Sequence, residues 1–108
     1  MSERVKIARI DDLPDGRGVR VEVGEDRIAV FRIGAHVYAL GDRCSHAEAS
    51  LAEGEIFDLE VECPRHGSAF DLVTGVPASL PATREVPTYE AMVEDGDVYL
   101  MLDAGAVS

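Results

Sequence analysis

Apolar and polar residues alternate with a period of two over several parts of the chain. Residues 19–23 alternate strictly, and residues 27–33 and 37–40 are apolar or β-branched runs separated by Gly34-Ala35-His36. A period of two is typical of strands, and two such runs around a short turn indicate a hairpin. We therefore expect a strand followed by a β-hairpin in the first half of the chain.

The two ends of the chain carry the same kind of pattern. Residues 5–10 predict a first strand, and the turn residues of segment 14–18 separate it from the next one. Near the C-terminus, residues 88–94 and 98–102 flank Asp95-Gly96-Asp97. Asp-Gly between two apolar runs is a strong hairpin signal, so a second β-hairpin is expected there.

The middle of the chain, residues 41–81, differs from both ends. Apolar runs are short there, and turn residues are dense: Gly54, Pro64, Gly67, Gly75, Pro77 and Pro81. The nearest approach to a helical stripe, residues 47–53, is too short to stand alone. The pattern predicts an all-β fold in which an irregular insert lies between strands at both ends, and loops on such a scaffold often carry function.

Length and charge bound the possible roles. The chain has 108 residues, which favours one domain with a modest core. It contains 10 Lys and Arg against 21 Asp and Glu, a formal charge of −11. Such a surface repels nucleic acids and anionic membranes, and it suits a partner with a basic docking face. The same acidity also serves solubility alone, and the sequence leaves both interpretations open.

The compartment is indicated by what the chain lacks. No stretch approaches the roughly 18 apolar residues needed to cross a bilayer, and residues 1–12 have no apolar core of a signal peptide. We therefore expect a cytoplasmic protein with no membrane partner. A lone disulfide would be unusual in a reducing cytosol, so the two cysteines are better explained as free thiols or metal ligands.

Both cysteines have a histidine close by. Cys44-Ser45-His46 is followed, sixteen residues later, by Cys63-Pro64-Arg65-His66. Three interpretations compete: unrelated residues with buried thiols, a structural zinc site, and a [2Fe–2S] cluster with two thiolates on one iron and two imidazoles on the other. The paired placement argues against the first, and zinc sites more often pair Cys with Cys and His with His.

These two segments resemble the C-x-H and C-x-x-H-G loops of the Rieske family. The resemblance implies an antiparallel β-sandwich of one domain, residues 1–108, with a small cluster-binding subdomain of loops and short strands at about residues 41–81. It implies one [2Fe–2S] cluster per chain. Cys44 and Cys63 would bind the inner iron, and His46 and His66 would bind the outer iron near solvent.

The resemblance also bears on the redox potential. Rieske proteins of respiratory complexes add a disulfide between the two loops and a tyrosine beyond the second, whereas this chain has Ala49, Arg65 and Phe70 at those positions. With fewer groups to stabilise the reduced form, we expect a midpoint below about 0 mV within the class range. Gly75-Val76-Pro77 and Leu80-Pro81 resemble the family's proline-bearing loop, which covers the cluster.

The remaining residues indicate a carrier rather than an enzyme. The sequence has no dinucleotide-binding glycine loop and no Ser–His–Asp set. Only His36 remains outside the cluster, so a second iron site with two histidines is not available. We therefore expect a protein that accepts and passes on single electrons.

The length and motif resemble the ferredoxin component of ring-hydroxylating dioxygenase systems. That resemblance implies an NAD(P)H-dependent flavoprotein reductase as donor, a terminal oxygenase as acceptor, and a monomeric carrier. Three alternatives remain open at this stage. They are a small subunit of an assimilatory nitrite reductase, a zinc-stapled binding module, and a role in iron–sulfur cluster assembly.

Overall fold

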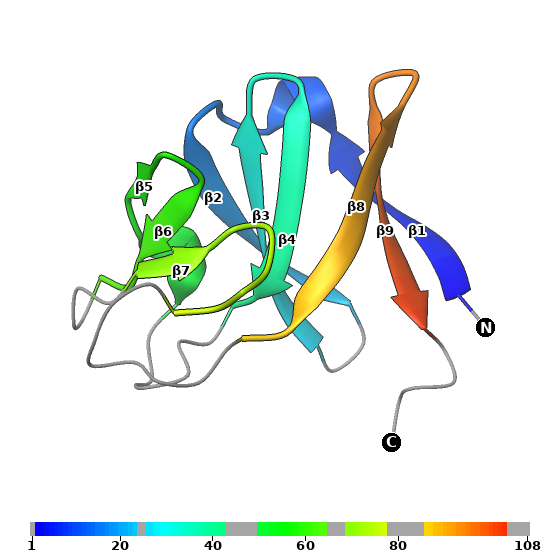
Figure 1. The fold of residues 1–108 in the computed structure, drawn as a ribbon. Coiled ribbons are helices and arrows are strands. Elements are labelled where there is room, and N and C mark those ends of the chain that lie inside the picture. The colour runs from blue at the N-terminus through cyan, green and yellow to red at the C-terminus, as the bar shows by residue number, and fades with distance from the viewer. Residues whose placement is uncertain (1, 24–25, 43–49, 65–68, 78–85, 104–108) are drawn as a thin grey trace.

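The protein is almost entirely built from β-strands (Figure 1). The computed structural model describes residues 2–23, 26–42, 50–64, 69–77 and 86–103. Its strands are β1 (Ser2–Arg9), β2 (Arg17–Val23), β3 (Asp26–Ile33), β4 (His36–Gly41), β5 (Ile56–Phe57), β6 (Glu60–Glu62), β7 (Ala69–Asp71), β8 (Thr88–Glu94) and β9 (Asp97–Asp103). Two short 3-10 helices, η1 (Ile10–Asp12) and η2 (Leu51–Glu53), complete the described elements. The predicted all-β class is confirmed.

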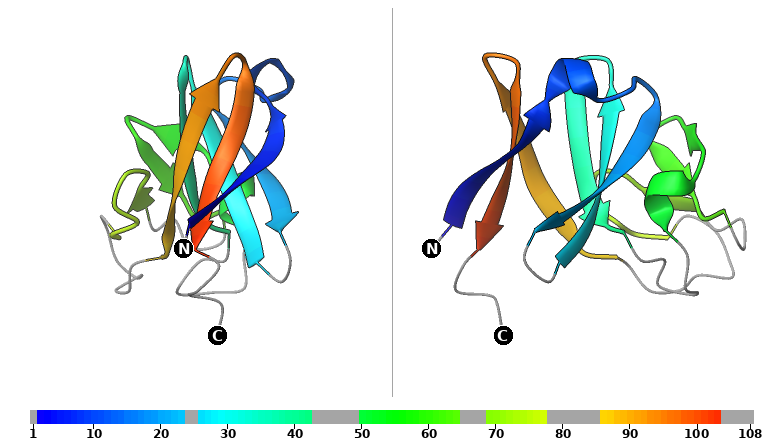
Figure 2. Two further views of the ribbon diagram at one scale, coloured as in Figure 1. Left: turned by 90° about the vertical axis from the view of Figure 1, so that its right-hand side faces the viewer. Right: turned by 180° about the vertical axis from the view of Figure 1, so that it is seen from behind.

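The strands form two antiparallel sheets. The larger has the order β1-β9-β8-β4-β3-β2, and the smaller has the order β5-β6-β7. Strands β4 and β8 share only two residue pairs, Ala39 with Tyr89 and Leu40 with Thr88. The large sheet therefore bends at this narrow junction, and in the side view of Figure 2 its β1-β9-β8 half crosses the β2-β3-β4 half.

One hydrophobic core fills the space between these two halves. It contains Leu13, Ile28, Val30, Ala39, Val98 and Leu100. Within the segments that the sequence predicts as strands, Ile28, Val30 and Leu100 are buried, and Val21 and Val37 are half-buried against the same core. The side chain of Leu102 lies outside the described part of the structure. Apolar residues from opposite halves bury one another here, which is the packing of a β-sandwich.

Both predicted hairpins are present. Strands β3 and β4 pair up to Ile33 and His36, and β8 pairs with β9 up to Glu94 and Asp97. Asp95 and Gly96 have φ values of 52° and 79°. These two positive values match the type I′ turn that two-residue hairpins prefer, which explains the Asp-Gly pair.

The strand boundaries on either side of the first turn differ from the expected ones. Strand β1 ends at Arg9 because η1 begins at Ile10, and β2 begins at Arg17, inside the predicted turn segment. The cause is Arg32 on β3. Its Nη1 donates to the carbonyl oxygens of Ile10 and Leu13, both at 3.0 Å, while its own carbonyl accepts from Gly16 N at 2.8 Å. These long-range bonds shape the β1–β2 connection.

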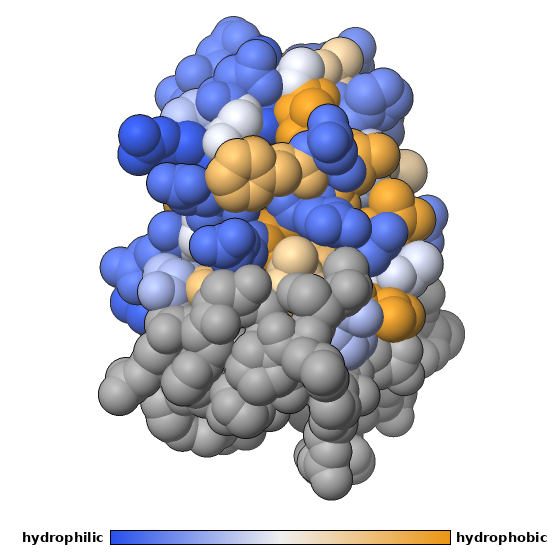
Figure 3. All heavy atoms as spheres, turned by 60° about the vertical axis from the view of Figure 1, so that its left-hand side comes forward, coloured by the Kyte–Doolittle hydropathy of each residue, from blue (hydrophilic) through white to orange (hydrophobic). Residues whose placement is uncertain are grey.

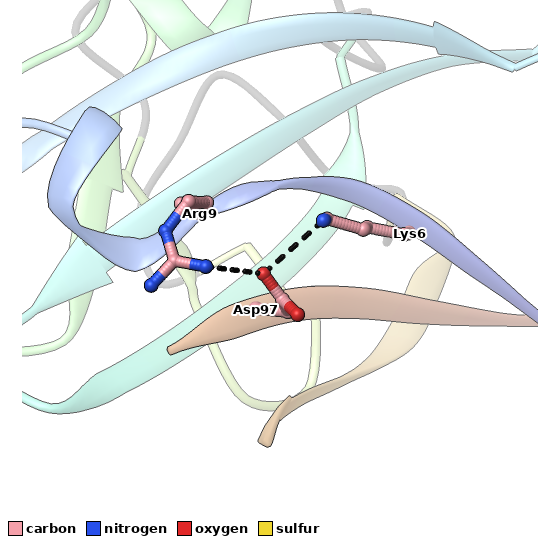
Figure 4. Close-up of polar contacts among 3 residues, drawn as sticks. All are labelled: Lys6, Arg9 and Asp97. Carbon is pink, nitrogen blue, oxygen red and sulfur yellow. Dashed lines mark hydrogen bonds and ion pairs between the residues drawn. The ribbon is translucent and has the colours of Figure 1, made fainter. Parts of the chain in front are cut away.

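Ion pairs join β1 to the C-terminal hairpin. Asp97 Oδ1 lies 3.2 Å from Lys6 Nζ and 3.0 Å from Arg9 Nη1 (Figure 4). Arg4 adds an ion pair to Glu94 at 2.6 Å and lies over the ring of Tyr99. Each exposed pair contributes little on its own, but together they neutralise acidic side chains of β8 and β9.

A second core joins the small sheet to the large one. It contains Ala29, Phe31, Leu40, Leu51, Val61, Cys63, Phe70, Leu72 and Val86. Leu51 from η2 lies between the two sheets and is fully buried. Strands β5–β7 and η2 thus form a compact unit beside β2–β4 (Figure 1), which is where the sequence predicts the inserted subdomain. Among the described residues, no helix is long and apolar enough to cross a membrane.

Candidate metal centre

The four residues proposed from the sequence as metal ligands lie in two connections of the small unit. The structure describes Cys63, whereas Cys44, His46 and His66 lie outside the described residues. Within the described ranges, no three Cys, His, Asp or Glu side chains come together as a metal site. The described part of the chain therefore bears on the site through Cys63 and through the residues that hold the ends of each segment.

Cys63 follows directly after β6. Its side chain is 0 % exposed, and it is a free cysteine within the second core, together with Val61 and Phe70. A thiolate in such apolar surroundings is costly unless a cation compensates its charge. A buried thiol can also serve simply as a small apolar group. Burial suits an inner iron ligand, because it places the sulfur away from water.

The segment that follows Cys63 is a hairpin connection. Glu62 on β6 pairs with Ala69 on β7, so residues 63–68 link two adjacent antiparallel strands. Glu62 N also donates to the Glu55 carbonyl at 2.8 Å. Both ends of the connection are thus held by the small sheet. The connection contains both Cys63 and His66.

A buried carboxylate holds the two ends of the other ligand segment. Asp42 is 3 % exposed, and its Oδ1 accepts from Ser50 Oγ at 2.7 Å and from Ala52 N at 3.0 Å. Its carbonyl accepts from Leu51 N at 2.6 Å, and its own N–H donates to Arg27 O at 3.0 Å. The hydrogen bonds of Asp42 with Ser50, Leu51 and Ala52 therefore join the two residues that flank segment 43–49 at the end of β4. We refer to these bonds as the Asp42 clamp. Sequence reasoning missed Asp42, because no local pattern marks it among the many acidic residues.

The proline-bearing segment is also held at both ends. Pro77 forms an isolated bridge with Phe70, and Val86 N donates to Gly75 O at 2.9 Å. Gly75 has a φ of +74°, and a Cβ there would collide with the carbonyl oxygen of Val86. Only glycine therefore permits this close approach. Leu80 and Pro81 lie outside the described residues.

The turn before Pro77 is organised by Asp71. Its carboxylate accepts from Val73 N at 2.7 Å and Thr74 N at 3.0 Å, and its carbonyl accepts from Gly75 N at 2.8 Å. This is the side-chain-to-backbone pattern of an Asx turn. It returns the chain to β7, so that Pro77 lies beside Phe70, and Phe70 belongs to the same core as Cys63.

All three segments therefore begin and end around the second core. The chemistry of the proposed donors, with one thiol already buried there, fits a cluster that has an apolar inner side. His36 is exposed beside the β3–β4 turn and is not among the proposed ligands. Arg43, Glu48 and Arg65, which the sequence places next to the proposed ligands, lie outside the described residues.

Comparison with known proteins identifies related sequences. Residues 3–90 match the model of the Rieske [2Fe–2S] domain family. The ferredoxin subunit of 3-phenylpropionate/cinnamic acid dioxygenase from Escherichia coli is 41 % identical over 100 residues, which cover 92 % of this chain and 93 % of that protein.

Two solved structures add complementary information. A ferredoxin in complex with the oxygenase of carbazole 1,9a-dioxygenase has a TM-score of 0.83 and 41 % identity, over 90 % of this chain and 91 % of that one. A putative NADH-dependent nitrite reductase small subunit from Mycobacterium tuberculosis has a TM-score of 0.87 but only 27 % identity, over 96 % and 98 %. The two folds fit about equally well, and the sequence identity favours the ferredoxin.

Proposed function

Because this chain belongs to the Rieske [2Fe–2S] domain family, we propose that it carries single electrons from an NAD(P)H-dependent flavoprotein reductase to a terminal ring-hydroxylating oxygenase. The observation that carries this proposal is the 41 % identity to a dioxygenase ferredoxin subunit over nearly the whole length of both proteins. The protein is an electron-transfer component rather than a catalytic enzyme. It works as a monomer in the cytoplasm, where its donor finds NAD(P)H.

The cofactor is a Rieske-type [2Fe–2S] cluster, which supplies reversible one-electron chemistry when it is bound. The family match favours this cluster over the structural zinc site that was one alternative for the Cys and His residues. We assign its ligands as Cys44 and Cys63 on the inner iron, and His46 and His66 on the outer iron. Burial of Cys63 supports the inner assignment, since a water-free sulfur ligand belongs on the core side.

The chain's own residues contribute a fixed frame for these ligands. The Asp42 clamp holds the ends of the first ligand segment, and the β6–β7 pairing holds the second. Pre-organised ligands need little rearrangement when the charge of the site changes by one electron, which favours fast transfer. The Asx turn at Asp71 and the Gly75–Val86 bond hold the third segment against the same core.

Reconstitution with purified partners tests the proposal. A purified flavoprotein reductase and a purified ring-hydroxylating oxygenase would be mixed with NAD(P)H and an aromatic substrate, with and without the holoprotein. We expect oxygenated product only when the holoprotein is present. Product formation at the same rate without it would contradict the proposal.

The nitrite reductase small subunit is retained as a second candidate, because one such protein covers 96 % of this chain with a TM-score of 0.87. In that role the domain would remain bound to a large haem-bearing subunit. Size-exclusion chromatography with each candidate partner separates the two roles. A stable complex with the large subunit of a nitrite reductase, without electron exchange with an oxygenase, would favour the second candidate.

A further inference from the structure

The small sheet has an inner face in the second core and an outer face toward solvent. Val61 and Cys63 are both 0 % exposed and belong to the second core. Glu62 lies between them and is exposed, because successive side chains of a strand point to opposite faces. Phe57, also on the outer face, is 56 % exposed. A charged side chain therefore lies on the outer surface directly beside a proposed ligand of the inner iron.

A second glutamate lies directly opposite Glu62. Strands β5 and β6 pair Ile56 with Val61, and the next step of the ladder is the hydrogen bond from Glu62 N to Glu55 O at 2.8 Å. Residues that face each other in an antiparallel pair lie on the same side of the sheet, with Cα atoms about 5.5 Å apart in a hydrogen-bonded pair. Both glutamates are exposed. Two like charges therefore share one place on the outer face.

The third strand brings no opposite charge to this pair. On β7, Ala69 is the residue that pairs with Glu62. Residues 44–64 contain six Asp and Glu and no Lys or Arg. Figure 3 views the side of the molecule on which the small sheet lies, and blue hydrophilic side chains form most of its described surface. The surroundings of the pair are thus acidic along the chain.

The described part of the chain does not neutralise the pair either. Its ion pairs join residues of β1 to Glu94 and Asp97 (Figure 4). Within the same ranges, the carboxylates of Glu55 and Glu62 form neither an ion pair nor a hydrogen bond. Like charges directly opposite each other destabilise a sheet. The two carboxylates therefore weaken the small sheet, and an account of them has to come from their charge.

The charge of Glu62 acts at short range on the proposed metal centre. Neighbouring Cα atoms are about 3.8 Å apart, so the Glu62 carboxylate lies within about 11 Å of the Cys63 sulfur in any rotamer. The Debye length at 0.1 M salt is about 10 Å, so salt screens this interaction only in part. Cys63 is buried among apolar residues, where charge interactions are stronger than in water. Because reduction adds one negative charge to the centre, a carboxylate this close opposes it.

We propose that Glu55 and Glu62 lower the midpoint potential of the cluster, and that this effect is what the like-charge pair contributes to the carrier. The inference rests on the proposed function, because it takes the ligand role of Cys63 from it. It adds a second cause of a low midpoint besides Phe70, which has no hydroxyl to donate. A lower midpoint makes the reduced carrier a stronger electron donor, whichever protein accepts the electron.

The experiment compares the midpoint of the wild-type holoprotein with those of Glu62→Gln, Glu62→Lys and Glu55→Gln. Each midpoint is measured at low salt by a redox titration that is followed in the visible spectrum. We expect all three variants to have a higher midpoint than the wild type. The shift in Glu62→Lys should be about twice that in Glu62→Gln, because the charge changes by two units instead of one. All three shifts should shrink as salt is added.

Asp95→Asn is the matched control. Asp95 is exposed in the β8–β9 turn, which lies at the end of the sandwich away from the connection after β6 (Figure 1). Its φ of 52° is one that asparagine tolerates, so this variant also removes one exposed carboxylate without disturbing the turn. Its midpoint should equal that of the wild type. In urea unfolding, both Gln variants should be more stable than the wild type, because the like-charge repulsion is removed.

An unshifted or lowered midpoint in Glu62→Gln would overturn the inference, as would an equal shift in Asp95→Asn. A Glu62→Lys shift no larger than that of Glu62→Gln would also overturn it, because a local disturbance and not the charge would then set the midpoint. If Glu62→Lys does not fold, the two Gln variants decide the matter. A wild type without the visible spectrum of a cluster would contradict the proposed function itself, which is a different result from a cluster whose midpoint these variants leave unaltered.

Discussion

Ser50 Oγ donates a hydrogen bond to the buried carboxylate of Asp42 at 2.7 Å, and this bond joins the two ends of the segment that contains Cys44 and His46. The same Asp42 oxygen accepts from Ala52 N at 3.0 Å. A carboxylate with little exposure needs such donors to offset its lost hydration. The clamp therefore stabilises the fold and also fixes where the first ligand segment starts and returns.

Removing this carboxylate should destabilise the protein and its cluster. In Asp42→Ala, Ser50 Oγ and Ala52 N lose their partner in a part-buried place, at a cost of about 1–3 kcal/mol. We expect a lower free energy of unfolding in urea and faster loss of iron to a chelator. Asp15→Ala is the control, because Asp15 accepts a hydrogen bond from Gly34 N on the exposed surface. Equal rates of iron loss in the two variants would contradict the role of the clamp.

Gly75→Ala should be far more damaging than Gly34→Ala. Both glycines have positive φ, but a Cβ at Gly75 would collide with Val86 O, whereas a Cβ at Gly34 would meet open space. Gly34→Ala should cost only the conformational penalty, about 1 kcal/mol. Gly75→Ala should add the clash and detach the third segment from the core, which urea unfolding of the two holoproteins would detect. Similar losses in both variants would refute the close packing of Gly75 on Val86.

The redox potential is predicted to lie below about 0 mV, within the range of the class. Phe70 is fully buried in the core that contains Cys63, where a tyrosine hydroxyl would bring a new donor. We expect Phe70→Tyr to raise the midpoint in a redox titration, because donors near the sulfur atoms favour the reduced state. Phe57→Tyr, on the exposed face, should leave it unchanged. A clearly positive wild-type midpoint would refute the prediction, and an unshifted Phe70→Tyr would mean that the ring points elsewhere.

The longer strands could be predicted from the sequence because each repeats its alternation over enough residues to reveal the period. Strands β5–β7 could not be placed, since two or three residues show no period. They form because Val61 and Phe70 pair across β6 and β7 and pack against Leu51, a contact between residues far apart in the chain. The second core could not be predicted either, because it includes Val61 and Phe70 of these short strands.

The candidate ligands were visible in the sequence because a Cys and a His recur at close spacing in two segments. The hydrogen bonds of Asp42 that hold the first ligand segment could not be predicted from the sequence. Asp42 resembles any acidic surface residue, and only folding brings Ser50 and Ala52 within hydrogen-bond distance of it. His36 is exposed beside a turn, and its exclusion from the ligand set stays a prediction. The mutual geometry of Cys44, His46 and His66 lies outside the described residues, so their ligand roles stay predictions.

Low-temperature electron paramagnetic resonance of the dithionite-reduced holoprotein tests the central claim most directly, namely that two thiolates and two imidazoles hold one [2Fe–2S] cluster. Imidazole ligation lowers the average g value relative to a cluster held by cysteines alone. We predict a single rhombic signal with this lowered average. A signal with the average of an all-cysteine cluster, or a reduced protein without any signal, would contradict the account.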